Sequence, residues 1–462
     1  MSHKGRRTFV ISLVLSFVGC SASLKSPSHQ EVVKQALPDT ADIGLAWRKV
    51  VSQGPVQDGW LSTFKDEKLE QLVHEVLQNN RDLAVAKANL ESAASLATQA
   101  GARLLPAVNV GSGTQSTKRG SNTSTSAGIS LNVQWELDLW GKLSATSSAA
   151  EETFRATEAS FVFARQSLVA QTAKAWYLAT EANLQKQLAE EAVEIYEKLL
   201  NIVQIRVDVG KAQQQDIYLA KADLAKANER QRQAIGSLEH AVRSLEIMLG
   251  RYPSSELEVP REFIPVPPSV PTGLPVELLE RRPDLRAAER QVAAAFQRIQ
   301  VAKAAKLPSI TLTGSGGRSS NELIDLIGVS HGFFSLGSNF LASFDIGGEL
   351  QAQVEIETAQ QKAALATYGS IALRAFDEVE SSLSNEVLLK EREALLASAV
   401  KNSKSALQIT DTQYQFGQVD LFRVLQMQAR SINSRISLIR IMNARLAQRI
   451  DLHLALGGNF SE

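Results

Sequence analysis

The stretch AGISLNVQWELDL, residues 127–139, alternates apolar and polar side chains without a break. Its apolar members are Ile129, Leu131, Val133, Trp135, Leu137 and Leu139. Because successive residues of a β-strand point to opposite faces, this stretch predicts a strand with one apolar and one polar face. A strand of roughly 10 residues or more is long enough to cross a bilayer when it is tilted.

Three further segments complete the predicted set of strands. Residues 333–346 carry the same alternation. Their apolar members are Phe334, Leu336, Phe340, Phe344 and Ile346. Residues 107–117 and 309–319 are weaker partners, rich in glycine and serine. We expect the tips KRGSNTSTS and GRSSNE to join the four strands into two hairpins.

The two hairpins lie in halves of the chain that resemble each other. NNRDLAVAKANL, which begins at Asn79, matches RRPDLRAAERQV, which begins at Arg281, at an offset of 202 residues. Beyond the first hairpin the offset is 207 residues, so that Asp138 matches Asp345. A change of offset confined to one segment, with register kept on both sides, indicates duplicated halves that differ by a loop insertion.

Each half is predicted to follow one plan: an amphipathic helix, two strands, a helix roughly 100 Å long at ~1.5 Å per residue, and a return helix. The predicted segments are an extended segment over 20–65; a first half, 66–250, with helices over Leu69–Leu104, 143–209 and 213–249; a linker over 251–274; and a second half, 275–457, with helices over Pro275–Lys306, 349–416 and 420–456. The linker is rich in proline and predicts an extended strap.

The apolar faces of the strands need cover that the rest of the chain does not offer. Two soluble hairpins packed on helices are the simpler interpretation, but four strands flanked by helices this long leave nothing obvious to cover the apolar faces of the strands. In a bilayer four strands cannot close, and an open edge would leave backbone groups without hydrogen bonds. The chain must therefore share a barrel with copies of itself, and the sequence allows two copies or three.

The composition excludes several classes of function. Lys and Arg number 49 and so do Asp and Glu, so no bulk charge attracts nucleic acid. No run of 18 apolar residues predicts a spanning helix. The 6 histidines are scattered without metal-ligand spacing, and GSGGRSS at Gly314 lacks the lysine of a phosphate-binding loop. We therefore expect no catalytic residue, no metal and no cofactor.

The N-terminus has the pattern of an exported lipoprotein. A basic start, Met1–Arg7, precedes an apolar run, Phe9–Val18, and this order predicts a secretory signal peptide over 1–19. The next residue, Cys20, is the only cysteine of the chain and resembles the acylated cysteine of a bacterial lipobox. By that resemblance Ser21 favours the outer membrane. The alternative is a plain signal peptide with an incidental cysteine.

Nearly the whole chain beyond this signal resembles the TolC-like outer-membrane efflux proteins, in particular their lipidated NodT-type branch. The resemblance rests on DGWLSTFKDEKLEQLVHEVLQNNRDL from Asp58, ELLERRPDLRAAERQVAAA from Glu277 and FDIGGEL from Phe344, together with the duplication and the lipobox. It implies a mainly α-helical fold with a membrane β-barrel portion. Three protomers would share a 12-stranded barrel, each giving four strands to it and its helices to a long periplasmic tunnel.

The resemblance implies a passive exit duct that exports small toxic compounds or drugs across the outer membrane. Its partners would be two further copies of the chain, outer-membrane lipid, a periplasmic adaptor protein and an inner-membrane pump of the resistance-nodulation-division type. Type I protein secretion uses the same kind of tunnel and is the alternative within transport. A structural periplasmic lipoprotein without a pore is the alternative from another class, and the alternating strands argue against it.

The resemblance also implies a periplasmic gate at the helix turns that follow Gly210 and Gly417. In relatives, acidic residues after these glycines ring the pore, and a contact between a tyrosine and an aspartate on different helices helps to hold it shut. Asp216 and Tyr414 stand at the corresponding places of this sequence.

The second half departs from the acidic pattern of the gate. Its VLQMQ puts Gln426 where relatives carry an acid, with Arg423 one turn earlier and Asp420 close by. Since a ring of carboxylates selects cations, its partial loss weakens the expectation of cation selectivity. The simpler interpretation makes Asp216 and Asp420 solvated residues at helix starts.

Overall fold

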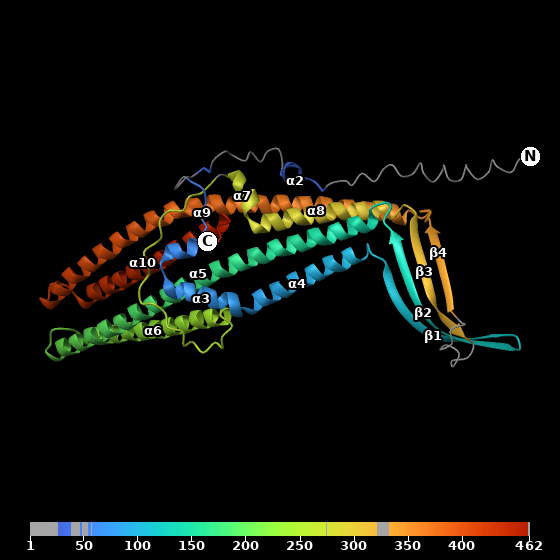
Figure 1. Ribbon diagram of the computed structural model, residues 1–462. Coiled ribbons are helices and arrows are strands. Elements are labelled where there is room, and N and C mark those ends of the chain that lie inside the picture. Colours follow the sequence, from blue (N-terminus) through green and yellow to red (C-terminus); the bar gives the residue numbers. More distant parts are fainter. Residues whose placement is uncertain are drawn as a thin grey trace, which may run out of the picture. The chain divides into compact units, whose positions relative to one another are not determined.

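The structure is a computed structural model that describes residues 26–37, 47–48, 54–56, 58–273, 275–320 and 332–460. The predicted signal peptide and Cys20 lie outside these residues. The elements (Figure 1) are α2 (His29–Ala36), η1 (Trp60–Phe64), α3 (Glu67–Asn79), α4 (Arg81–Ala102), β1 (Ala107–Arg119), β2 (Asn122–Leu137), α5 (Lys142–Asp208), α6 (Gln214–Met248), α7 (Pro275–Arg281), α8 (Pro283–Ala304), β3 (Ser309–Ser320), β4 (Gly332–Leu341), α9 (Glu349–Gln415) and α10 (Leu421–Ala455). None of the described helices has both the length and the apolar character that a membrane span requires.

The chain forms two compact units, and each takes segments from both halves of the sequence. Unit 1 comprises residues 1–41, 88–159 and 285–371. Unit 2 comprises residues 42–87, 160–284 and 372–462. The two sequence repeats therefore do not fold as separate bodies, because each one packs against its counterpart in both units.

Unit 1 contains one antiparallel sheet with the strand order β1-β2-β3-β4. The register pairs Arg119 with Asn122, so the first hairpin turns in two residues, of which Gly120 has φ +63°. The predicted loop KRGSNTSTS was too long, because its serine and threonine residues continue the hydrogen-bonded ladder between β1 and β2. The last predicted strand was also too long: β4 ends at Leu341, and Phe344 and Ile346 lie beyond it.

An aspartate and a glycine turn the chain from each hairpin into a long helix. Asp138 accepts hydrogen bonds from the backbone N–H groups of Leu143 and Ser144, both at 2.8 Å. Asp345, its counterpart, accepts them from Leu350 at 3.2 Å and Gln351 at 2.9 Å. These carboxylates pair with N–H groups that have no partner within the helix.

The helix predicted over Leu69–Leu104 is two helices, α3 and α4, separated at Asn80. The Asn80 backbone is extended, and its side chain accepts a hydrogen bond from the Leu83 N–H at 2.9 Å. The helix predicted over Pro275–Lys306 is likewise divided into α7 and α8 at Arg282. Pro283 disfavours a helical conformation at the residue before it and has no N–H to donate.

The two breaks are tied to the ends of the two return helices in unit 2. The Asn80 amide donates to the Met248 carbonyl at 2.9 Å, and the Arg282 guanidinium donates to the Ala455 carbonyl at 3.2 Å. The four residues correspond to each other at the two repeat offsets, so the same contact is built twice with different side chains. Gly250 lets the chain pass the Asn79 carbonyl so closely that a Cβ there would lie 2.7 Å from its oxygen.

The linker lies on unit 2, where buried polar groups hold it. The Glu246 carboxylate accepts hydrogen bonds from three successive linker N–H groups, those of residues 255, 256 and 257, at 2.7, 2.9 and 3.1 Å. Arg449, 2% exposed, pairs with Glu386 and donates to the carbonyls of two successive prolines, 267 and 268. These bonds replace the ladder that an extended segment lacks.

The segment over 20–65 is not extended throughout, which corrects the prediction. It contains α2 and the 3₁₀ helix η1. Ser28 and Glu31 form a capping box that starts α2, since each side chain bonds the other residue's backbone N–H. In unit 1, His29 of this helix lies 2.7 Å from a Glu289 oxygen of α8.

We expect Gly250→Ala to destabilise the protein more than Gly210→Ala. Both glycines have left-handed φ, +73° and +72°, which costs an alanine about 1–2 kcal/mol. Only at Gly250 would the new Cβ also meet backbone, whereas nothing lies within 4 Å of that position at Gly210. Thermal unfolding in detergent should show a clearly larger drop in midpoint for Gly250→Ala. Equal drops would contradict the close passage past Asn79.

We also expect acid to weaken unit 2 through His453. This side chain is 5% exposed and stacks on Trp60 with the ring centroids 5.5 Å apart. Burial, with the nearby charge of Arg449, lowers the pKa of His453 to about 3. The unfolded chain then binds the proton below pH ~6.5 and the folded chain does not, so stability falls by roughly 2 kcal/mol from pH 7 to pH 5.

The pH dependence is measured as the difference in unfolding midpoint between wild type and His453→Phe at each pH. This difference should shift in favour of the variant as the pH falls from 7 to 5. His74→Gln, which removes an exposed histidine, should follow the wild type. A constant difference between His453→Phe and wild type would refute the buried neutral histidine.

Candidate functional site

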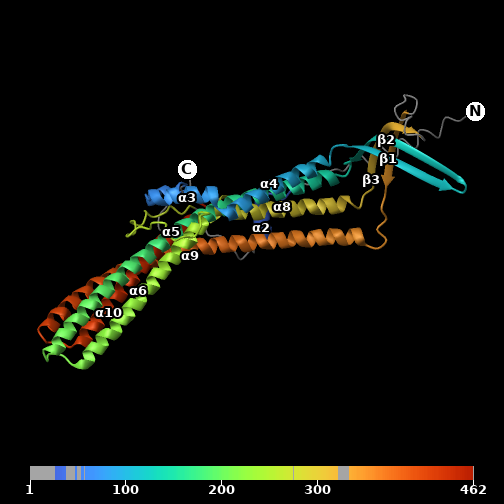
Figure 2. The same ribbon diagram turned by 90° about the horizontal axis from the view of Figure 1, so that it is seen from below.

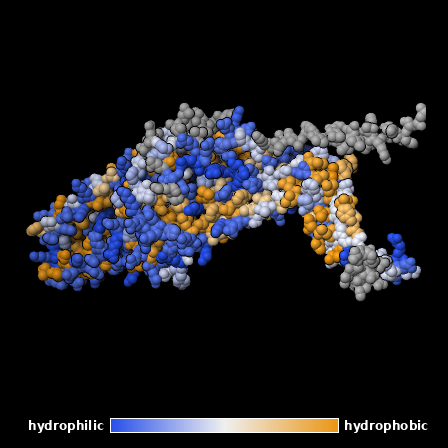
Figure 3. Space-filling view, in the orientation of Figure 1, coloured by the Kyte–Doolittle hydropathy of each residue, from blue (hydrophilic) through white to orange (hydrophobic). Residues whose placement is uncertain are grey.

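One face of the sheet is mainly apolar, with Ser112, Arg318 and Ser338 as polar members. Its rows, read from β1 to β4, include Val108–Val133–Gly314–Leu336 and Val110–Leu131–Gly316–Phe334. Phe334 and Leu336 are 75% and 76% exposed, and hydrophobic residues gather over the strands in Figure 3. In the described chain this apolar face has no cover, and a patch of this kind marks a surface that meets lipid or another protein.

The opposite face of the sheet is polar. Its rows include Asn109–Asn132–Ser315–Ser335 and Glu136–Thr311–Asn339. The register therefore confirms the predicted alternation in β2 and in the part of the last predicted strand that β4 covers. Phe333 is an exception that the sequence pattern did not suggest, since it lies in a polar-face row opposite Gly317.

The two edge strands of the sheet are open. In the described chain β1 pairs only with β2, and β4 pairs only with β3. The outer backbone N–H and C=O groups of both edges are thus available to strands of another chain.

At the other candidate site, in unit 2, two glycines end the long helices. Gly210 and Gly417 have φ +72° and +73°. The N–H after each glycine reaches back into the last helical turn, from Lys211 to the Arg206 carbonyl at 2.7 Å and from Gln418 to the Gln413 carbonyl at 2.9 Å. This is the glycine C-cap of a helix, built identically at both turns.

The two acidic residues predicted for the gate begin the return helices. Asp216 accepts a hydrogen bond from the Gln213 N–H at 3.0 Å. Asp420 accepts one from the Arg423 N–H at 2.9 Å. The Arg423 guanidinium also donates to the Gln426 side chain at 3.2 Å. Each carboxylate thus has a local partner at the start of a helix.

Tyr414 is held by an arginine and does not contact Asp216 within the chain. The Arg206 guanidinium lies 4.2 Å from the centre of the Tyr414 ring and donates to the Tyr414 carbonyl at 2.8 Å. The Tyr414 hydroxyl is buried and has no hydrogen-bond partner among the described residues. The contact joins α5 to α9 beside both turns and combines a cation–π interaction with a charged hydrogen bond. Sequence reasoning missed Arg206, because Gln413 stands at its place in the other repeat.

Further along, α10 is tied to α5 by charged contacts. The Arg435 guanidinium binds both carboxylate oxygens of Glu191 at 2.7 Å, and this hydrogen bonding lowers the pKa of Glu191. Lys174 and Asp451 form another ion pair at 2.8 Å. In the described parts of the chain no group of three His, Cys, Asp or Glu side chains could hold a metal ion.

In unit 2, α6 lies beside α5 and α10 beside α9 in two views at right angles (Figures 1 and 2). Residues of all four helices form one hydrophobic cluster at the turns, which includes Val203, Ile217, Tyr414 and Leu425. The turns are therefore packed against each other and do not hang free as separate loops.

Comparison with known proteins gives one consistent result. Residues 72–251 and 274–458 match the family described as outer membrane efflux proteins. The cation efflux system protein CusC of Escherichia coli O6:H1 is 28% identical and is aligned over 97% of this chain and 98% of its own. The pyoverdine export outer membrane protein OpmQ of Pseudomonas aeruginosa is 29% identical over 92% of this chain and 93% of its own.

The fold has solved counterparts as well. The structure of the open state of the MtrE outer membrane channel of Neisseria gonorrhoeae superposes with a TM-score of 0.82 at 26% identity. It covers 94% of this chain and 98% of its own. The likeness thus includes helices and strands together.

Proposed function

The chain belongs to the outer membrane efflux protein family and is an outer-membrane efflux channel; from this premise we propose that it is the passive exit duct of a tripartite pump that exports small toxic compounds. The observation that carries the proposal is the uncovered apolar face of a sheet with two open edges. A lipid-facing barrel needs an apolar outer face and paired edges on all its strands.

Closure of that barrel requires other copies of the chain. Each protomer supplies four strands, and β1 of one copy would pair with β4 of the next. Three copies give 12 strands, within the range of outer-membrane barrels. The polar face, with its asparagine and serine rows, would then line the water-filled interior.

The remaining parts of the proposal concern anchoring and partners. Cys20 would be acylated and hold the N-terminus in the outer membrane, while the helices extend into the periplasm. A periplasmic adaptor protein and an inner-membrane pump of the resistance-nodulation-division type would deliver the substrate and the energy. CusC, named for cation efflux, and OpmQ, named for pyoverdine export, act on chemically different cargoes, which supports a duct of low intrinsic specificity.

The turns after Gly210 and Gly417 would form the periplasmic gate. Asp216 and Tyr414 would meet across helices when it closes, with Asp420, Arg423 and Gln426 lining the opening. The Arg206 contact supports this role, since it fixes Tyr414 beside both turns.

The barrel is tested by single cysteines along β2 in isolated outer membranes. Cysteines at Ile129, Leu131 and Val133 should react with a lipid-soluble maleimide and resist a charged one, because they would face acyl chains. Cysteines at residues 130, 132 and 134 should react with the charged reagent. A cysteine at Lys198, 76% exposed on a helix, reports reagent access.

Uniform reactivity at odd and even positions would refute the lipid-facing sheet. The same membranes, extracted in mild detergent, should give a native mass of three protomers that each begin at an acylated Cys20. A monomer with an unmodified N-terminus would refute the shared barrel and the anchor.

The gate is tested in cells by Asp216→Asn combined with Tyr414→Phe. Both changes keep side-chain volume, and we expect several-fold greater entry of a large antibiotic such as vancomycin, since about 1–2 kcal/mol of closing contact would be lost. The matched control is Asp208→Asn with Tyr218→Phe, where Tyr218 is 64% exposed. Entry of the antibiotic equal to that in the control would refute the proposed Asp216–Tyr414 contact in the closed gate.

A further inference from the structure

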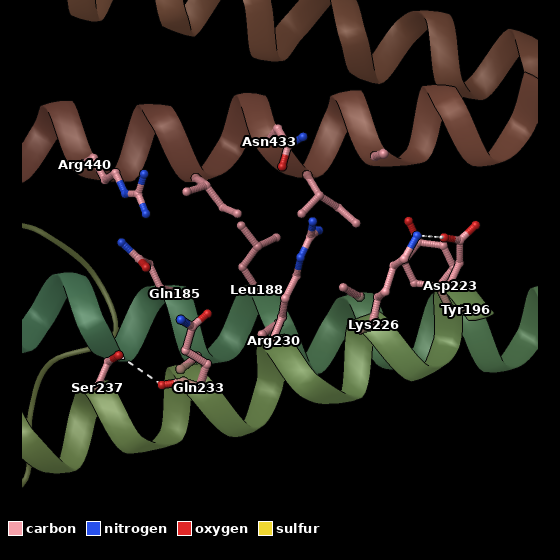
Figure 4. Close-up of a pocket in the computed structure, with 17 residues that line it drawn as sticks. Gln185, Leu188, Tyr196, Asp223, Lys226, Arg230, Gln233, Ser237, Asn433 and Arg440 are labelled. Atoms are coloured by element: carbon pink, nitrogen blue, oxygen red, sulfur yellow. Dashed lines mark hydrogen bonds and ion pairs between the residues drawn. The ribbon is translucent and has the colours of Figure 1, made fainter. Parts of the chain in front are cut away.

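A groove of about 530 Å³ lies between α6 and α10 and has α5 as its floor (Figure 4). It is lined entirely by residues of unit 2, and every lining residue lies at least 12 positions from Gly210 and from Gly417 along the chain. Its volume falls in the range of sites that hold drug-sized molecules.

The charged groups of this groove are unbalanced. Lys226, Arg230 and Arg440 face one carboxylate, that of Asp223. Asp223 lies 3.5 Å from Lys226, and neither arginine makes an ion pair with any carboxylate that the structure describes. Figure 4 shows Arg230 of α6 and Arg440 of α10 directed into the gap from opposite sides.

Three other arginines of α10 differ from Arg440 in this respect, whereas Arg423 and Arg430 also form no ion pair with a described carboxylate. Arg435, Arg445 and Arg449 each pair with a glutamate of α5 or α9. Arg440 and Arg230 share a groove in which no carboxylate is placed for either of them.

The lining of the groove is mixed, and the polar side chains of Gln185, Gln233 and Asn433 lie beside an apolar strip. Leu188 of α5 and Ile432 and Ile436 of α10 line it together with several alanines. Tyr196, 7% exposed, closes the end where Asp223 lies. A ligand there would find an apolar strip and two exposed guanidinium groups, which bind planar or tetrahedral oxyanions in paired hydrogen bonds.

We propose that this groove binds an amphiphilic organic anion, with its carboxylate, sulfonate or phosphate between Arg230 and Arg440 and its apolar body on Leu188 and Ile432. The two arginines belong to different sequence repeats, so the bound anion joins α6 to α10. The described ion pairs of α10 reach α5 and α9 and none reaches α6, so the ligand would add a charged link to the apolar contacts between α6 and α10.

The test measures binding of naphthalene-2-sulfonate to the full-length channel in phosphatidylcholine nanodiscs by titration calorimetry, with empty nanodiscs as the blank. Wild type should bind the sulfonate. Arg230→Ala combined with Arg440→Ala should weaken binding at least tenfold. The uncharged naphthalene-2-methanol should bind wild type at least tenfold more weakly than the sulfonate does. It should bind wild type and the double variant with equal affinity.

The matched control is Arg232→Ala with Arg430→Ala. It removes the same charge from the same two helices at exposed positions outside the groove and should leave binding unchanged. The proposal is overturned if wild type does not bind the sulfonate, if both double variants bind alike, or if the uncharged compound binds as well. Unfolding midpoints of both variants, expected to match wild type, separate lost binding from lost folding.

Discussion

Backbone hydrogen bonding at the edges of the sheet is the constraint on which the rest of the structure depends. Four strands leave two edges, and the apolar face of those strands belongs in an environment without water to satisfy them. In the proposed barrel β1 and β4 would therefore pair with other copies. In a closed ring each hairpin must keep a fixed position relative to the long helix that follows it. Asp138 and Asp345 fix that position, because each joins a hairpin to a long helix through the same two capping bonds.

The two repeats also share a contact that fixes the ends of their return helices. The breaks at Asn80 and Arg282 bind the carbonyls of Met248 and Ala455, so each return helix closes onto the start of its own repeat. An amide suffices at the first site, whereas Arg282 also pairs with Asp284 and Glu378. The two sites have the same geometry but different side chains. The feature that both repeats share is therefore the hydrogen bond to the backbone carbonyl.

The repeats are not equal where gating and binding are proposed. The Arg206–Tyr414 contact occurs once per chain, and so does the groove that Arg230 and Arg440 line. A strictly symmetric duplication would build neither. Asymmetry thus gives α5, α6, α9 and α10 distinct neighbours within a frame whose helix ends are alike, which is what a duct needs if part of its wall is to move while the rest stays closed.

The sequence by itself determined the elements whose signals are local. Period-two alternation located the strands and their apolar face, glycines located the helix ends, and internal matching located the repeats. It merged α3 with α4 and α7 with α8, because a single Asn80 or a Pro283 interrupts a helical pattern that continues on both sides. Only the tertiary structure decided which partners meet: the linker prolines on Arg449, Tyr414 on Arg206, and segments of both repeats in each unit. Such contacts join residues about 180 to 210 positions apart, and no local propensity encodes them, since they depend on how whole helices pack.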